Sequence, residues 1–338
     1  MENTENFLAV QEGLFEEIRQ KLPQHQSLVS VISDMFGLGL DAAYKRIRGD
    51  KRLDLDEICA LCKRYKVSFD QIMDVKYPHD FDCKYRPINS SVPIEYHDYI
   101  NSLSENFKKL RHSKESSILL SATDIPVFHL LPHKELRFFK LFTFAHGVYN
   151  YKESWEKFIS EMSTKEIEDK HKIISRDYEL IPSTEIWTES TIDSTLKLIK
   201  YYHDISVFPD VELPMLLCEQ VLSILNNLES WATKSQKNDC DTPFTLYLSE
   251  MEIGNTYILL KNPIGDNCIV KLFTINHLDI SDKEFCKEAE DWLTKLSRRS
   301  LLLCGGSEKE RIQFFNLQRR KVQSVIDSIL THFDTPLE

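Results

Sequence analysis

The strongest chemical signal in the sequence is a cluster of cations between positions 45 and 52. Five basic side chains stand there against one carboxylate, that of Asp50: Lys45, Arg46, Arg48, Lys51 and Arg52. Cations spaced this closely can neutralise the phosphates of a nucleic acid and release its counterions. The whole chain carries a net charge of −11, so a duplex is repelled from the rest of its surface. We therefore expect a focused basic patch that docks on DNA in one orientation.

Cysteine and histidine side chains slightly further along the chain could hold a metal ion. Cys59-x-x-Cys62 is followed by His79-x-x-x-Cys83, a spacing that could place four ligands around a tetrahedral zinc. However, Cys59 and Cys62 fall on the same helical stripe as Leu55, which we expect to pack in a core. Free cysteine is a common small core residue. We therefore predict a packing role for both cysteines, and we expect no metal and no cofactor.

Two other groups of residues are candidates for ligand binding or catalysis. The turn Gly305-Gly306-Ser307 could present backbone amides to an anion, but its spacing is not that of a P-loop and the P-loop lysine is absent. A tight turn explains the two glycines as well. Three histidines lie among aromatic residues without a nucleophile at a recognisable spacing: His129, His133 and His146. We therefore expect that the chain is not an enzyme.

Two short helices around a glycine-broken corner are predicted to position the basic cluster. Apolar residues recur every three or four positions over 28–35, so they share one face of a helix. Ser27 is the expected N-cap, because its hydroxyl can accept from an amide of the first turn. The run Phe36-Gly37-Leu38-Gly39 interrupts this helix, since glycine tolerates a positive φ. A second helix is expected from about Asp41 to Arg48, ended by Gly49.

Three further helices are expected around this pair, over 7–22, from about 54 to 65, and over 68–73. The whole stretch resembles the helix-turn-helix domains of the lambda-repressor-like (XRE) class, above all their BetR-like variants, in regulators of the Bacteroides type. The residues that carry the resemblance are Phe36-Gly37, Ala43-Tyr44-Lys45-Arg46-Ile47-Arg48-Gly49, Leu55 and Ile58 with Leu61, and Tyr65-Lys66-Val67-Ser68-Phe69-Asp70. The resemblance covers roughly the first quarter of the chain. It implies a five-helix bundle that reads the major groove through the helix at about 41–48.

We expect the DNA-contacting residues to be Ser27, Asp41, Ala42, Tyr44, Lys45, Arg46, Arg48, Lys51 and Arg52. Small residues near the start of the second helix let it approach the groove, while the cations reach the groove and its phosphate walls. Leu40 departs from the family pattern, because many members place glutamine there to grip adenine. Asp41 beside it would be repelled by phosphate unless it caps the helix or accepts from a cytosine amine. The sequence therefore does not predict the operator.

Three regions are predicted to follow a DNA-binding domain at residues 1–77. Residues 78–93 are rich in proline and polar residues and are predicted to form a linker. Residues 94–240 are expected to be a mostly helical middle region, with a buried and partly extended segment at 118–131. Its helices are predicted near 96–111, 136–151, 153–163, 165–178, 184–203 and 213–235. Through ATDIPVFHLLPHKELRFFKLF at 122–142 it is similar to the region that follows the DNA-binding domain in some Bacteroides-type regulators.

Residues 241–338 change to the pattern of short strands. Runs of β-forming residues occupy 245–251, 256–262, 267–276 and 300–304, and Asn262 to Asn267 is a hairpin-type connection. Ser281 with Glu284, and Ser307 with Glu310, are expected to open two helices as capping boxes. This region is predicted to be a small antiparallel sheet with two helices, for dimerisation or sensing. The expected fold class is therefore mainly α with a C-terminal α+β part.

Composition agrees with a globular protein of 338 residues, 42% hydrophobic and 28% charged. Eight scattered cysteines and a start without an apolar leader favour a reducing cytoplasm, and no apolar run is long enough for a membrane helix. We expect a cytoplasmic, sequence-specific transcription regulator that binds a double-stranded DNA operator as a homodimer. A small-molecule or peptide effector is compatible with the C-terminal part. The alternative is a helix-turn-helix adaptor that mediates protein interactions without specific DNA binding.

Overall fold

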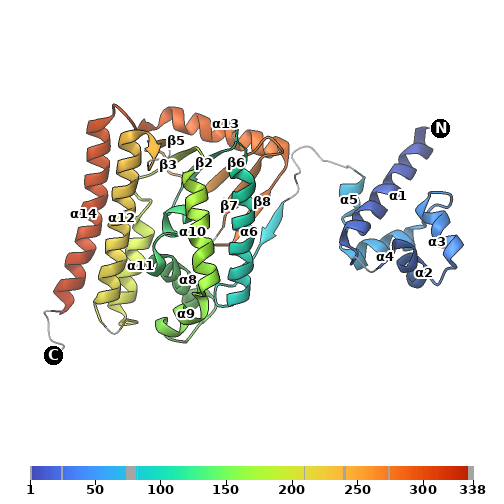
Figure 1. Ribbon diagram of the computed structural model, residues 1–338, viewed down its shortest axis with the longest axis horizontal. Helices are drawn as coiled ribbons and strands as arrows, with labels where there is room; N and C mark the ends of the chain where they lie inside the picture. The colour runs from blue at the N-terminus through green and yellow to red at the C-terminus, as the bar shows by residue number, and fades with distance from the viewer. Residues whose placement is uncertain are drawn as a thin grey trace. The chain divides into compact units, whose positions relative to one another are not determined.

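The computed structural model describes residues 2–23, 26–73, 81, 83–113, 115–208, 210–238, 241–272 and 275–333. The chain divides into two compact units, Met1–Phe81 and Asp82–Glu338, which are described separately (Figure 1). Residues 78–80 and 82 of the predicted linker lie outside the described residues. Within the described ranges, no helix combines the length and the apolar character needed to cross a bilayer.

The described part of the smaller unit consists of helices packed around one core. These helices are α1 (Glu2–Lys21), α2 (Leu28–Phe36), α3 (Leu40–Ile47), α4 (Leu55–Tyr65) and α5 (Phe69–Ile72). Residues from α1 to α4, together with Leu53 and Val67, form the core: Leu14, Phe15, Ile18, Leu28, Ile32, Ala43 and Leu61. The predicted apolar face of α2 is confirmed, because its Leu28, Val31 and Ile32 are buried. The Ser27 hydroxyl accepts from the Ser30 amide at 3.2 Å, as expected of the N-cap.

The predicted packing face of α4 is wrong for Leu55 and Cys59, whereas Ile58 and Cys62 are half-buried and pack against the core. Leu55 is 73% exposed and Cys59 is exposed, whereas Leu61 and the carboxylate residue Glu57 are buried. Asp54 and Glu57 form a capping box in which each side chain accepts from the backbone amide of the other. This capping box and the ion pair of Glu57 with Arg46 of α3 orient α4 so that Glu57 faces inward. The expected packing role therefore does not hold for Cys59, while Cys62 is half-buried.

The larger unit is organised by a nine-stranded mixed sheet within its described residues. Its strands are β1 (Lys84–Arg86), β2 (Ser117–Ala122), β3 (Ser183–Trp187), β4 (Gln236–Lys237), β5 (Thr242–Leu248), β6 (Tyr257–Lys261), β7 (Asn267–Lys271), β8 (His277–Ile280) and β9 (Leu301–Leu302). The strand order is β1-β8-β7-β6-β2-β3-β5-β4, and β9 pairs with β5. The central strands β2, β3 and β5 are parallel, and the remaining pairs are antiparallel.

Helices cover the two faces of this sheet unequally (Figure 1). One face packs against α13 (Lys283–Arg299), through residues such as Leu259 of β6 and Leu293 of α13. The opposite face carries most of the larger core, to which β6 contributes Ile258 and Leu260. Successive residues of β6 thus serve opposite cores, as the two-residue period of a strand requires. The helices of the larger core are α6 (Pro93–Arg111), α7 (Val127–Leu130), α8 (Lys134–Val148), α9 (Trp155–Met162), α10 (Lys165–Glu179), α11 (Asp193–Asp204), α12 (Glu212–Lys234) and α14 (Glu308–Phe333).

The predicted separation of a helical middle region from a C-terminal sheet at residue 240 is wrong. Ile118 of β2 pairs with Ser183 of β3 on one side and with Leu260 of β6 on the other. Strands from both predicted regions therefore share one sheet and one core. Residues 184–187, expected to begin a helix over 184–203, belong instead to the central strand β3, which β2 and β5 flank. Part of the predicted linker is also structured, since Lys84–Arg86 pairs with β8.

Several local predictions in the larger unit are confirmed. The aromatic segment of α8 is a core helix, buried from Leu136 to Ala145. The Asn262 to Asn267 connection joins the antiparallel pair β6 and β7. The predicted cap of α13 is wrong by one residue, because the side chain of Asp282, not Ser281, accepts from the Phe285 amide. The Ser281 hydroxyl instead accepts from the Asn267 side chain.

Candidate functional site

A three-residue corner joins α2 to α3 in the smaller unit. Gly37 adopts a left-handed conformation with φ 61°, and the Leu38 amide donates to the Ser33 carbonyl. The Ser33 hydroxyl donates to the Leu38 carbonyl at 2.6 Å and closes the corner from the other side. A corner of three or four residues between two packed helices is typical of helix-turn-helix motifs. The chain therefore turns sharply at Gly37 and presents α3 beside α2.

The outer face of α3 is exposed along its length. Leu40 is 60% exposed and Tyr44 is 50% exposed, while Asp41, Lys45 and Arg48 are also exposed. Ala42 is half-buried and Ala43 is buried in the core of the smaller unit. Since residues three and four apart lie on one side of a helix, the exposed side chains form one continuous surface.

Two of the exposed cations have carboxylate neighbours on the same surface. Lys45 Nζ lies 2.8 Å from Asp41 Oδ2, and Arg48 Nε lies 3.2 Å from Asp50 Oδ2. The hydrogen bond from Lys45 and its charge lower the pKa of Asp41. Asp41 is thus bound to Lys45, in the first turn of α3, where the helix dipole favours a negative charge. Ion pairs this exposed are weak, so a phosphate can replace either carboxylate.

Arg46 does not reach the surface, in contrast to the sequence-based expectation. Its guanidinium is 5% exposed and pairs with Glu57 of α4, with Nη2 lying 2.7 Å from Glu57 Oε1. Its Nη1 also donates to the Ala42 carbonyl at 3.3 Å. Arg46 belongs to the buried side of α3, because the helical period places it beside Ala43 rather than Lys45. Its guanidinium therefore fixes α3 to α4 and is not exposed on the outer face of α3.

Gln11 of α1 holds the segment that follows α3. Its side-chain amide donates to the carbonyls of Arg46 and Lys51, at 2.7 and 3.1 Å, and its oxygen accepts from the Leu53 amide. Lys51 and Arg52 are thereby held on an exposed loop. Sequence reasoning missed Gln11, although a polar residue one turn before Leu14 on the buried face of α1 was a usable signal. Ser27, also predicted as a contact, is exposed, and its hydroxyl serves the cap of α2.

The weaker candidates are distributed through the two units. Cys59 and Cys62 lie on α4, and His79 lies outside the described residues. Groups of three or more metal-ligating side chains do not occur in the described ranges. At the glycine turn, the Gly305 amide donates to the Ala232 carbonyl and the Ser307 amide donates to the Cys304 carbonyl. These two amides are therefore not available to an anion.

The three histidines singled out in the sequence lie in the larger unit, in different surroundings. His146 Nδ1 lies 3.1 Å from the Tyr202 hydroxyl. His133 occupies the N-cap of α8, and burial lowers its pKa. His129 Nε2 lies 2.9 and 3.0 Å from the two carboxylate oxygens of Glu185.

Glu185 is the centre of a fully buried polar network on β3. It accepts from His129, from the Tyr178 hydroxyl and from the indole N–H of Trp187, the last at 2.8 Å. Burial raises the pKa of Glu185, but the charge of His129 and the three hydrogen bonds outweigh burial and lower it. Lys237 lies beside this network and donates to two backbone carbonyls, with its Nζ 3.5 Å from the ring centre of Tyr178. Both oxygens of Glu185 are occupied, so the network is structural.

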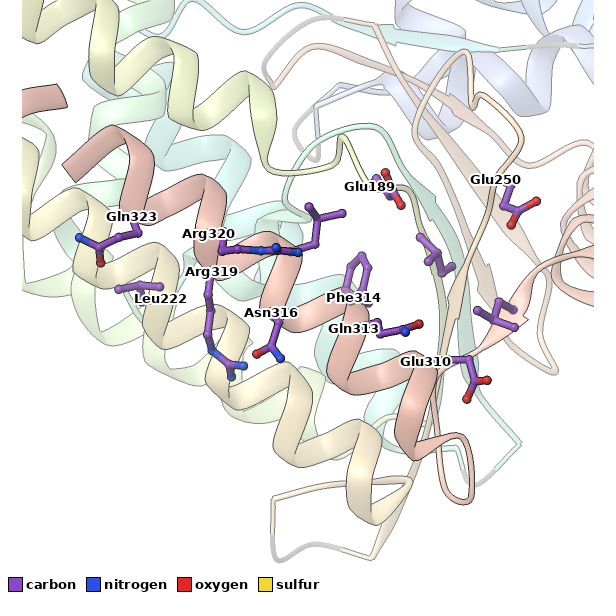
Figure 2. Close-up of a pocket in the computed structure, with 13 residues that line it drawn as sticks. Glu189, Leu222, Glu250, Glu310, Gln313, Phe314, Asn316, Arg319, Arg320 and Gln323 are labelled. Atoms are coloured by element: carbon purple, nitrogen blue, oxygen red, sulfur yellow. The ribbon is translucent and has the colours of Figure 1, made fainter. Parts of the chain in front are cut away.

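The carboxyl ends of the parallel strands open into two adjoining hollows, the usual place for ligands in sheets of this kind. The smaller, of about 600 Å³, is lined by Thr123, Thr188 and Ser249, which follow β2, β3 and β5. The larger, of about 980 Å³, runs along α14 (Figure 2). Its charged lining residues are Glu189, Glu250, Glu310, Arg319 and Arg320. Figure 2 shows the three glutamates on one side of the hollow and the two arginines on the other, and Arg319 already pairs with Glu229 of α12.

Comparison of the chain with models of protein families, with curated proteins and with solved structures found no match. Its function therefore has to be inferred from its own residues. Among the surfaces described, the outer face of α3 and the loop after it combine exposure, cationic charge and a fixed backbone.

Proposed function

We propose that the chain is a DNA-binding transcription regulator that inserts α3 into the major groove of a double-stranded operator. The observation that carries this proposal is the exposed face of α3, on which Tyr44, Lys45 and Arg48 lie beside one another. The loop that follows adds Lys51 and Arg52, which would contact the phosphates on the groove wall. The proposed domain is a lambda-repressor-like bundle of α1 to α5.

The rigidity of the backbone around α3 supports this proposal. Arg46 and Glu57 tie α3 to α4, and Gln11 ties the following loop to α1. Side chains on a backbone held from two sides lose little further freedom when they bind, which favours affinity. In this proposal Arg46 positions the contacting residues, and Tyr44, Lys45, Arg48, Lys51 and Arg52 make the contacts.

The proposal is tested by fluorescence anisotropy of the full chain on labelled promoter and random duplexes, from about 50 to 200 mM salt. We expect selective binding that weakens steeply with salt. The double variant K45A/R48A should weaken promoter binding by about tenfold or more and reduce the salt slope by about two. A matched control is K63A/R64A, which removes the same charge from the exposed end of α4.

The control should bind within about twofold of the unmodified chain, because only long-range attraction changes. If K45A/R48A binds as tightly as the unmodified chain at matched salt, α3 is not the reading helix. If both double variants lose affinity equally, DNA is attracted by the overall charge of the unit, and the proposed docking through α3 is wrong.

A second candidate function, a protein-interaction adaptor, is favoured by exposed apolar residues on α3 and α4. Leu40 and Tyr44 on α3 and Leu55 on α4 are exposed by 60%, 50% and 73%. Exposed apolar side chains contribute to protein interfaces when they gather in one patch. The adaptor would show no steep salt dependence on any duplex, so the same anisotropy experiment separates the two functions.

The regulator is proposed to act as a homodimer, because one small reading helix contacts one half-site and two symmetric half-sites supply the affinity. Sedimentation of the full chain with a palindromic and a half-site duplex measures the stoichiometry. Two chains per palindrome are expected, whereas one chain per palindrome would overturn the homodimer.

A further inference from the structure

A cavity in the larger unit lies between α6, α8 and the face of the sheet formed by β6, β7 and β8. Its outer part measures about 710 Å³ and its inner part about 80 Å³. The two parts adjoin, because they share five lining residues, and together they are called the passage here. The shared residues are Tyr99, Val127, Ile258, Ile269 and His277. The outer volume falls within the range of roughly 300 to 1,000 Å³ that is usual for small-molecule sites. The inner part has room for a few water-sized groups.

The passage changes in character from its middle to its inner end. The shared residues Val127, Ile258 and Ile269 give it an apolar middle. The inner end instead contains the side chains of Asp124, Lys140 and Lys271. A molecule that follows the passage inward therefore passes the charged side chains of the outer part first, then the apolar middle, and reaches the charged inner end last. The charged residues of the outer part are Arg86, Glu95, Asp98 and Asp279.

Asp124 accepts hydrogen bonds from other groups, and its carboxylate lies closer to Lys140 than to Lys271. Its Oδ1 accepts from the Ser194 hydroxyl at 2.8 Å and from the Ile125 amide at 2.9 Å. Its Oδ2 lies 2.7 Å from Lys140 Nζ but 3.7 Å from Lys271 Nζ. Burial raises the pKa of Asp124, but the two lysines outweigh burial and lower it, so the carboxyl group is ionised.

Lys271 is the cation without a carboxylate of its own. Its side chain is 26% exposed, and its nearest carboxylate in the described part of the chain is the one that Lys140 binds at closer range. Burial lowers the pKa of Lys271, while attraction to Asp124 raises it. A partly buried ammonium with one shared counterion is incompletely compensated.

Arg137 of α8 adds an unused donor to the same inner end. It is 5% exposed, and its charge is paired with Glu168. Its Nε has no hydrogen-bond partner among the described residues. Two carboxylates thus stand against three cations, which leaves one positive charge in excess.

We propose that this passage binds a small amphipathic carboxylate, with its anionic head against Lys271 and its apolar body along Val127, Ile258 and Ile269. The carboxylate supplies the missing negative charge, and its apolar body fills the middle of the passage. This proposal does not depend on DNA binding. If the proposed regulator is correct, this site is where an effector acts.

The test is isothermal titration calorimetry of the full chain with octanoate, 4-phenylbutyrate and the neutral analogue octan-1-ol. Saturable binding of at least one carboxylate below about 1 mM is expected, with octan-1-ol at least about tenfold weaker than octanoate. K271M should weaken octanoate by about tenfold or more and leave octan-1-ol unchanged, whereas K271R should retain most of the affinity. K287M is the matched control, because exposed Lys287 lies on α13, which packs on the other sheet face.

A second variant, I269W, narrows the passage without changing its charge and should weaken both octanoate and octan-1-ol. Circular dichroism of each variant shows whether it is folded. If K271M is unfolded, the titrations of K271R and of I269W decide the question. The proposal is overturned if K271M binds octanoate as tightly as the unmodified chain. Failure of both carboxylates to saturate by about 10 mM overturns it as well.

Discussion

In the smaller unit the buried ion pair of Arg46 and Glu57 lies directly behind a helix whose outer face is exposed and cationic. In the larger unit the fully buried carboxylate of Glu185 lies on the central strand β3, between β2 and β5. The first pair holds a surface in place, because Glu57 also caps α4 through the Asp54 amide. The second network holds the interior, because its donors come from β3, α7 and α10. Buried charge therefore holds an exposed helix face in place in the smaller unit, whereas in the larger unit it holds the core together.

The distribution of tryptophan allows this difference to be measured. All four tryptophans belong to the larger unit: Trp155, Trp187, Trp231 and Trp292. Tryptophan fluorescence therefore reports unfolding of the larger unit alone. Far-UV circular dichroism reports both units, since both are rich in helix.

The largest effect is expected for E185A, which removes the acceptor of three buried donors. We expect a loss of about 5 kcal/mol in the free energy of unfolding of the larger unit, because His129, Tyr178 and Trp187 lose their partner. Urea unfolding followed by tryptophan fluorescence measures it. The control E189A truncates an exposed glutamate just after β3 and should change stability by less than about 0.5 kcal/mol. Equal effects of the two variants would mean that the network does not support the core.

A smaller effect is expected for R46A, and in the other unit. It leaves Glu57 buried without a cation, which should destabilise the smaller unit by about 3 kcal/mol. The transition seen by circular dichroism should move, while the tryptophan transition stays in place. R48A, which removes an exposed guanidinium from the end of α3, should shift neither transition by more than about 0.5 kcal/mol. A shift of the tryptophan transition in R46A would mean that the two units unfold together.

The smallest effect is a pH dependence caused by Lys237. Burial lowers its pKa from 10.5 to about 7. Between these values the unfolded chain binds the proton that the folded chain has released, so the free energy of unfolding rises with pH. Relative to K237M, the unmodified chain should gain about 2 kcal/mol between pH 7 and pH 9, measured by urea unfolding with tryptophan fluorescence. Exposed K283M should keep the slope of the unmodified chain. Parallel slopes for K237M and the unmodified chain would show that Lys237 does not titrate in this range.

The sequence predicted the elements whose signals are local. The apolar face of α2 with its Ser27 cap, the core helix α8 and the hairpin between β6 and β7 follow from period, capping and turn chemistry. The central strand β3 was missed because its Glu185 looks like a surface residue, and its partner His129 lies 56 residues away. Parallel strands pair with residues far away in the chain, so a short segment of sequence carries no signal for this pairing.

The candidate site was predictable in part for a similar reason. The exposed cations Lys45 and Arg48 belong to a recognisable cluster, and α3 carries them on its outer face. Arg46 belongs to the same cluster, and its burial depends on Glu57, eleven residues later, whose inward direction depends in turn on the cap of α4. Gln11 acts on the loop after α3 from 35 to 42 residues away. The charge pattern therefore identified the surface, but it could not distinguish the exposed side chains from the buried side chains that position them.

The pairing of β1 with β8 also determines the order in which the chain can acquire structure during synthesis. Lys84 reaches its partner Asp279 only after most of the chain has been translated, whereas the core of the smaller unit is complete within residues 14–67. At about 5 to 20 residues per second, roughly 10 s or more of translation separates the two events. During that time the smaller unit can already be folded, while β1 and β2 still lack their neighbours β8 and β6. Chaperones protect unpaired strand edges in nascent chains. We therefore expect that the larger unit, rather than the smaller one, needs chaperones during synthesis.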